Sequence, residues 1–227
     1  MFKSKKTIIR VGVLSAAALV VFGAPAAFAA SSYNVTAGSA PAGTVVGYTA
    51  TTTGASPQVT FTDTTAGVVL NCASASATGT VTAGTNLSGT GIGTVDGPRW
   101  ALTTCTGPFG LTFTHTGVGS WGLDATGDTV GGVTPVSISG VNVHFASGGC
   151  DFDYTGSIDG TYTNGPSTGT LDLPGTTSTL TISNVSGSGF LCVFAGIKNG
   201  DRASFEATYQ VAADTGAYNP IQITSNP

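Results

Sequence analysis

The sequence has very little basic charge. Lysine and arginine together account for 7 of the 227 residues, against 11 aspartates and glutamates. Four of the seven cations lie within the first ten residues, so residues 30–227 keep only Arg99, Lys198 and Arg202 with all 11 acids, a formal net charge of −8. Three cations cannot neutralise a run of phosphates or hold the chain on an anionic membrane surface. Nucleic acid and electrostatic membrane binding are therefore excluded.

Stretches of good helix formers are also scarce. Glycine occurs 34 times, and each glycine destabilises a helix interior in which it falls. Threonine, whose branched Cβ favours extended backbone, is abundant. What recurs is an alternation of apolar and polar residues over short segments bounded by Gly, Asn, Asp or Pro. The clearest such segments are residues 43–54, 58–63, 110–117, 140–148, 169–175, 179–185 and 203–211.

This alternation predicts an all-β fold. About a dozen short strands without helical crossovers must pair mostly antiparallel, as in a β-sandwich or a closed barrel. We expect one domain over residues 30–227, with a seam near 131–135 between two halves that show a faint likeness. Lysine commonly protects edge strands, so its scarcity indicates a closed barrel, short edges broken by glycine, or a homo-oligomer that pairs its edges.

One long apolar run occurs, near the N-terminus. The basic segment MFKSKKTIIR precedes VGVLSAAALVVFGA, and AFA at 27–29 fits a small-x-small cleavage site. This layout predicts a signal peptide over residues 1–29. The alternative, a membrane anchor, is disfavoured because the run is shorter than the ~20 residues that a spanning helix needs. We expect a mature protein without a membrane span that is secreted and works outside the cell or at its surface.

The chain has four cysteines, Cys72, Cys105, Cys150 and Cys192, and all lie beyond the predicted signal peptide. An even number in an oxidising compartment predicts two disulfides. Three pairings are open. The likeness of the two halves favours neighbours in sequence, Cys72 with Cys105 and Cys150 with Cys192. A zinc site is the alternative, but no Cys-x-x-Cys or cysteine–histidine cluster supports it.

The segment CDFDYTGSIDGTY, residues 150–162, has two interpretations. Asp151, Asp153 and Asp159 stand at the first, third and ninth positions of a calcium loop, but the twelfth position holds Tyr162 in place of a bidentate carboxylate. Alternating apolar residues and the Thr-Gly and Asp-Gly pairs indicate a strand, a turn and a second strand. The hairpin is the interpretation that we favour, with a weak calcium site on the three aspartates as the alternative.

Groups suited to catalysis are few and scattered. His115 shares the apolar face of its strand with Phe113, whereas His144 lies on the polar face of its strand, and Glu206 is the sole glutamate. Ser167 formally fits Gly-x-Ser-x-Gly, but its surroundings, NGPSTG, indicate a hairpin turn with no helix to follow. We therefore predict no catalytic residues, and no cofactor or metal site.

The two tryptophans, Trp100 and Trp121, lie beside turn-like residues in GPRWAL and GSWGLD. Either ring could stack on a sugar. Large aromatics also fill the ends of hydrophobic cores, and core packing is the interpretation that we favour.

The segments LNCASASATGTV and LTTCTGPFGLTFTHTG, with the closing ASFEATYQV, resemble a group of small secreted β-proteins of actinobacteria. The likeness covers most of the mature region and all four cysteines. The group has no assigned activity, so the resemblance implies an exported, disulfide-bonded β protein and no site residues.

Three functions stay open at this point. The first is a non-catalytic extracellular or cell-surface protein with a structural or binding role toward a surface, polysaccharide or protein partner. The second is a secreted hydrolase with a site built from separated aspartates and a histidine, which requires His115 or His144 in a cleft near a carboxylate. The third is a pore-forming envelope protein, which requires strands of about nine to eleven residues with a continuous apolar face.

Overall fold

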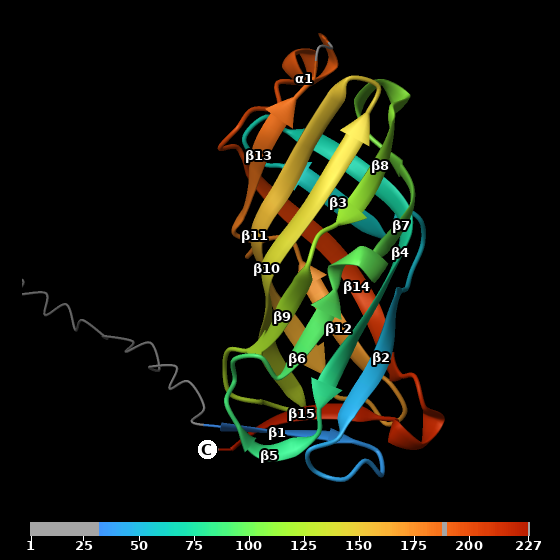
Figure 1. The fold of residues 1–227 in the computed structure, drawn as a ribbon, viewed down its shortest axis with the longest axis vertical. Coiled ribbons are helices and arrows are strands. Elements are labelled where there is room, and N and C mark those ends of the chain that lie inside the picture. Colours follow the sequence, from blue (N-terminus) through green and yellow to red (C-terminus); the bar gives the residue numbers. More distant parts are fainter. Residues whose placement is uncertain (1–31, 188–189, 227) are drawn as a thin grey trace, which may run out of the picture.

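The computed structural model describes residues 32–187 and 190–226, and strands dominate them (Figure 1). The predicted signal peptide at 1–29 lies outside the described residues. The strands are β1 (Ser32–Ala37), β2 (Val45–Thr52), β3 (Val59–Asp63), β4 (Val68–Thr82), β5 (Gly84–Leu87), β6 (Gly93–Asp96), β7 (Ala101–Thr106), β8 (Thr112–Gly117), β9 (Ser120–Ala125), β10 (Val133–Ser147), β11 (Cys150–Thr163), β12 (Gly169–Pro174), β13 (Leu180–Ser186), β14 (Arg202–Ala213) and β15 (Ile221–Asn226). Short helical turns are η1 (Gly97–Arg99), η2 (Pro108–Gly110), α1 (Phe190–Ala195) and η3 (Gly216–Tyr218).

The strands form a closed antiparallel barrel with eight strand positions, which confirms the all-β prediction and selects the barrel over the sandwich. Four long strands, β4, β10, β11 and β14, run along the wall at both of its levels. Shorter strands fill the gaps between them. At the upper level, nearest α1 in Figure 1, these are β3, β7, β8 and β13; at the lower level they are β2, β6, β9 and β12. Each level closes on itself through β10 and β11, which pair directly.

Strand β11 corrects the prediction of a hairpin at 150–162. The segment is one strand that pairs with β10 from Cys150 to Thr163, with a register shift opposite Gly156. Gly156 has φ +139°, and a Cβ there would lie 2.6 Å from the backbone oxygen of Thr179. Gly156 therefore marks a close approach of two backbones, beside a bulge whose extra residue lies on β10 at Ser139–Gly140. The prediction was wrong because glycine serves a close backbone approach as well as a turn.

The lower end of the barrel is closed by a separate sheet of β15, β1 and β5 (Figure 1). Hydroxyl and amide side chains bind the outer edge of β15: Thr129 Oγ1 accepts from Ser225 N at 2.7 Å, and Asn164 bonds both backbone groups of Ile223 at 2.8 Å. Side chains thus occupy backbone groups that an open edge would expose. Barrel closure and this covered edge explain how the fold protects its edges with so little lysine.

Aromatic side chains fill the upper half of the barrel. Phe61, Phe145, Phe152, Tyr154 and Phe205 are each no more than 2% exposed. The Phe61 ring centroid lies 4.8–5.2 Å from those of three of the others, in tilted, edge-on and stacked arrangements, which aromatic quadrupoles favour. A cavity of about 30 Å³ beside Phe61 and Phe205 has room for about one water molecule. The interior is therefore a packed core.

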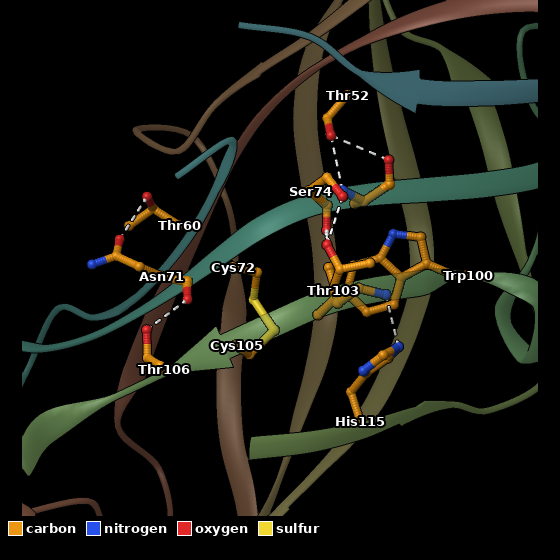
Figure 2. Close-up of a disulfide and its surroundings, with 12 residues drawn as sticks. Thr52, Thr60, Asn71, Cys72, Ser74, Trp100, Thr103, Cys105, Thr106 and His115 are labelled. Carbon is orange, nitrogen blue, oxygen red and sulfur yellow. Dashed lines mark hydrogen bonds between the residues drawn. A yellow bond between two sulfur atoms is a disulfide. The ribbon is translucent and has the colours of Figure 1, made fainter. Parts of the chain in front are cut away.

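Both disulfides lie at the upper level and have the pairing that the sequence favoured. Cys72 on β4 bonds to Cys105, the residue directly opposite on β7, with their Cα atoms 4.0 Å apart (Figure 2). Cys150 at the start of β11 bonds to Cys192 in α1. One disulfide thus joins two paired strands, and the other holds the only α-helix of the described residues to the wall. In residues 32–187 and 190–226, no helix is long and apolar enough to cross a membrane.

Candidate functional site

Both tryptophans lie in the core, as favoured from the sequence. Trp100 is 6% exposed and Trp121 3% exposed. Trp100 Nε1 donates to the Tyr209 hydroxyl at 3.2 Å, and Trp121 Nε1 donates to the Val118 carbonyl at 3.1 Å. Since each indole N–H is satisfied inside the protein and each ring is covered, neither ring offers a face to a sugar.

His115 has a structural position in the wall. Its Nε2 accepts a hydrogen bond of 2.9 Å from the backbone N–H of Leu102, where β7 and β8 no longer pair backbone to backbone (Figure 2). Burial lowers the pKa of His115 and outweighs the opposite effect of a backbone hydrogen bond at Trp100. The imidazole is therefore neutral at pH 7 and replaces a ladder hydrogen bond, which agrees with the partly buried strand residue that we expected.

His144 belongs to a polar group on the outer wall. Its Nδ1 lies 2.6 Å from Asp153 Oδ1 on the neighbouring strand, and Asn184 Nδ2 donates to Asp153 Oδ2 at 2.7 Å. Asn184 reaches Asp153 from a bulge in β13, where it has φ +52°. The hydrolase alternative required a histidine near a carboxylate, and this pair meets that part of the requirement.

Within residues 32–187 and 190–226, no nucleophile is hydrogen-bonded to the His144–Asp153 pair. The His144 side chain is 45% exposed on the outside of the barrel, and its cross-strand neighbour on β8 is Thr116. In the described residues, no hydroxyl is hydrogen-bonded to His144 Nε2, the nitrogen that a base needs for activating a nucleophile. Sequence reasoning placed His144 correctly on the polar face but did not find Asp153, because strand pairing decides which residue lies opposite.

The three aspartates of the calcium alternative do not converge. Asp153 and Asp159 are six residues apart in one extended strand, about 20 Å at the usual rise per residue. Asp153 is already bound to His144 and Asn184. A calcium ion needs six to eight oxygens around one point, and the strand separates those that the loop interpretation brought together.

Ser167 lies exposed in the turn between β11 and β12, and a strand follows it, so the expected hairpin turn is confirmed. Glu206 faces outward, as expected. It lines a hollow of about 220 Å³ together with Asp172, which lies diagonally opposite on the adjacent strand β12. Thr208 donates a hydrogen bond of 2.7 Å to Asp172. That Asp172 and Glu206 line one hollow was not anticipated, because the two strands are distant in sequence.

A larger hollow lies at the upper end, where the β3–β4 turn, η2 and the end of α1 meet. It measures about 430 Å³, and none of the described residues that line it is charged. Residues that the structure places along it include Val69, Asn71, Thr106, Pro108, Phe109 and Ala195. We call it the upper hollow. Its size is within the range of small-molecule sites.

Phe109 stands at the rim of the upper hollow. It is 69% exposed and has φ +59°, a conformation that costs a non-glycine residue energy and is concentrated at functional positions. Beside it, Asn71 Oδ1 accepts from the Thr60 hydroxyl at 3.2 Å, and the Thr106 hydroxyl donates to the Asn71 carbonyl (Figure 2). The Asn71 Nδ2 group makes no hydrogen bond within the described residues, so it is a donor available to a ligand.

Sequence reasoning did not find the upper hollow. Its one signal was GPFG at 107–110, a turn sequence that holds a large aromatic residue. Comparison with protein families, with curated proteins and with solved structures finds no match to this chain. The geometry of the hollow and of the outer wall is therefore the basis for a functional assignment.

Proposed function

We propose that this chain is a secreted, non-catalytic protein that binds an uncharged polysaccharide outside the cell or at its surface through the upper hollow. The observation that carries the proposal is the hollow itself: about 430 Å³, lined without charge, with an exposed phenylalanine at its rim. The other partners considered from the sequence, a surface or a protein, remain outcomes of the test.

The chemistry of the hollow suits a neutral sugar. Sugar rings present apolar C–H faces, which pack on aromatic and aliphatic side chains, and hydroxyls, which exchange hydrogen bonds with amides and hydroxyls. The upper hollow combines both kinds of group in Phe109 and Val69 on one hand and Asn71 and Thr106 on the other. A charged ligand would find no counter-ion among the lining residues.

An extracellular location is supported by the disulfides. Disulfides persist in oxidising compartments and are rare in the cytosol. The protein has two of them, Cys72–Cys105 and Cys150–Cys192. Export through residues 1–29 and an actinobacterial origin stay predictions of the sequence.

The polarity of the wall argues against the pore-forming alternative. A transmembrane barrel has an apolar outer band and a polar lumen. Here the inward positions of the long strands are buried and mostly apolar, such as Val141, Val143 and Phe145 on β10. The outward positions carry polar groups, for example Asn142 and His144. This is the arrangement of a protein whose outer surface contacts water.

The proposal is tested by affinity electrophoresis and calorimetry of the purified mature protein with soluble glucan, galactan and arabinan. We expect a saturable interaction with at least one of them, weakened at least tenfold by Phe109→Asn. Asparagine tolerates positive φ, so the change removes the ring without adding backbone strain. Val130→Asn is the matched control, because Val130 is 75% exposed on the loop before β10. Equal binding by both variants, or none by the wild type, contradicts the proposal.

The second candidate, a secreted hydrolase, is favoured by one observation, the 2.6 Å contact between His144 Nδ1 and Asp153 Oδ1. It predicts release of reducing ends or of acyl groups from the same polysaccharides. We expect no turnover above a buffer control. Turnover that His144→Gln abolishes, with the fold unchanged by circular dichroism, would replace the binding assignment by the hydrolytic one.

A further inference from the structure

Two carboxyl groups are buried together beside the upper hollow. Asp63 is the last residue of β3 and is 0% exposed; Asp201 directly precedes β14 and is 8% exposed. Charged carboxylates are rarely buried unless cations or several donors surround them. The position of the pair therefore calls for a physical explanation.

Each carboxyl group is held by its own turn. Asp63 Oδ1 accepts hydrogen bonds from the backbone N–H groups of Thr65, at 2.9 Å, and Ala66, at 2.8 Å. Asp201 Oδ2 accepts one from the backbone N–H of Lys198 at 2.8 Å. These bonds fix one oxygen of each group and leave the other oxygens to face their surroundings.

The Asp63 carboxyl group interacts with that of Asp201, and Asp63 Oδ2 is buried without any N–H or O–H donor in the described residues. Two ionised carboxylates repel and cannot form a hydrogen bond, whereas one proton between them satisfies both. Burial raises the pKa of Asp63, and the neighbouring Asp201 acts in the same direction.

Among the described residues, no cation is paired with either carboxyl group to replace that proton. Tyr154 on β11 interacts electrostatically with Asp63, and burial, more than this interaction, raises the pKa of Tyr154, so its hydroxyl stays neutral. Lys198 and Arg202 are the nearest cations in sequence; both are exposed, and the ion pairs of the described residues include neither. Neither β13 nor α1 brings an acidic or basic side chain to the pair in the part of the chain that the structure describes.

We propose that Asp63 and Asp201 share one proton and form a pH-sensitive latch between the turn at 64–67 and the loop at 196–201. Backbone contacts already join these segments: Thr64 N donates to the Arg202 carbonyl at 2.8 Å, and Arg202 N donates to the Thr65 hydroxyl at 3.0 Å. The shared proton adds the link between the two side chains. Loss of the proton leaves two like charges in a buried site and loosens both segments.

The direction of the pH response follows from the raised pKa. The latch is fully closed below pH about 4, where even an exposed aspartate is half protonated, and closure is lost as pH rises through the raised pKa of Asp63. Between pH about 4 and this raised pKa, separation of the two segments releases one proton. The ratio of open to closed forms of the latch therefore rises about tenfold per pH unit. Gly67, Val68 and Ala195 line the upper hollow next to these segments, so opening alters its wall; that consequence rests on the proposed function.

The test is amide hydrogen exchange of the disulfide-bonded protein between pH 4.5 and 8.5, expressed as protection factors for residues 63–67 and 196–202. The wild type is expected to lose at least tenfold protection there as pH rises. Asp63→Asn keeps the Oδ1 acceptor and supplies a permanent donor to Asp201, so its protection should stay constant. Asp159→Asn, an exposed aspartate on β11, is the matched control and should behave as the wild type.

Three outcomes would overturn the latch. One is wild-type protection independent of pH in these segments, and another is a loss as large in Asp63→Asn as in the wild type. The third is loss of protection at every pH in Asp63→Asn together with a gain in the wild type on addition of calcium chloride, since that result assigns the pair to a cation. The experiment contains no polysaccharide, so its failure leaves the binding proposal standing, and the reverse also holds.

Discussion

The two ends of the barrel are closed by different means. At the lower end, the sheet of β15, β1 and β5 covers the opening, and hydrogen bonds hold it to the rim: Tyr162 donates to the Ile221 carbonyl at 2.9 Å, and Asn164 bonds Ile223. In the part of the chain that the structure describes, no such sheet covers the upper end. There both disulfides, a six-residue helix and the aromatic core hold turns around a hollow.

The difference shows which end is suited to recognition. A sheet whose β15 edge is satisfied by side chains leaves few groups there for a partner, whereas turns positioned by covalent bonds keep polar and apolar groups available at the surface. The lower end thus stabilises the barrel, and the upper end presents the hollow and the carboxyl pair. Three changes break or sharpen this contrast.

The largest effect is expected from removal of the Cys150–Cys192 disulfide by a double substitution to serine. The bond closes a loop of 42 residues, and its loss should reduce the free energy of unfolding by about 4 kcal/mol in the loop-closure model. Urea denaturation measures this value. Hydrogen exchange of the same variant should rise in β13 and α1 while β1 and β15 stay protected. An equal rise at both ends would contradict the division of roles.

A smaller effect is expected at the lower end from Tyr162→Phe. The hydroxyl is buried and is bonded to the Ile221 carbonyl, so its removal leaves a buried acceptor without a donor and should cost about 1–2 kcal/mol. Tyr218→Phe is the control, because the Tyr218 hydroxyl makes no hydrogen bond in the described residues. Urea denaturation compares the two variants. A cost below that of the control would show that the lower sheet is held mainly by packing.

The smallest effect concerns His115→Gln at the upper level and appears only in acid. Burial lowers the pKa of His115 in the folded protein, so its contribution is complete above the unfolded pKa of about 6.5 and is lost as pH falls through the lower, folded value. Glutamine accepts the same bond from Leu102 N without titrating. The wild type should therefore lose stability relative to the variant near pH 5, measured from melting temperatures at pH 7 and pH 5. Parallel pH profiles would disprove this role.

Much of the wall could be predicted from short-range pattern. The alternation at 140–148 and at 203–211 correctly identified the inward residues, because one face of each strand is buried. The cysteines form disulfides with their neighbours in sequence, which is the pairing that the sequence analysis favoured. The choice between barrel and sandwich could not be made, since it depends on four long strands whose pairing joins distant segments. The close backbone approach at Gly156 could not be told from a turn, because glycine serves both.

The candidate sites depended on long-range pairing to a greater degree. Asp153 lies beside His144 because β10 and β11 align there, and Asp63 meets Asp201 across 138 residues of sequence. Contacts between residues so far apart in sequence cannot be predicted from a local sequence pattern. The upper hollow likewise draws on three segments, and only the turn around Phe109 left a trace in the sequence.

The central claim, recognition of a neutral ligand at the upper hollow, is tested most directly by nuclear magnetic resonance. Backbone amide shifts of the isotope-labelled mature protein are followed during titration with the polysaccharide that it binds. The account predicts perturbations concentrated at residues 67–71 and 106–109. Perturbations concentrated around His144 and Asp153, or on the lower sheet, would contradict it.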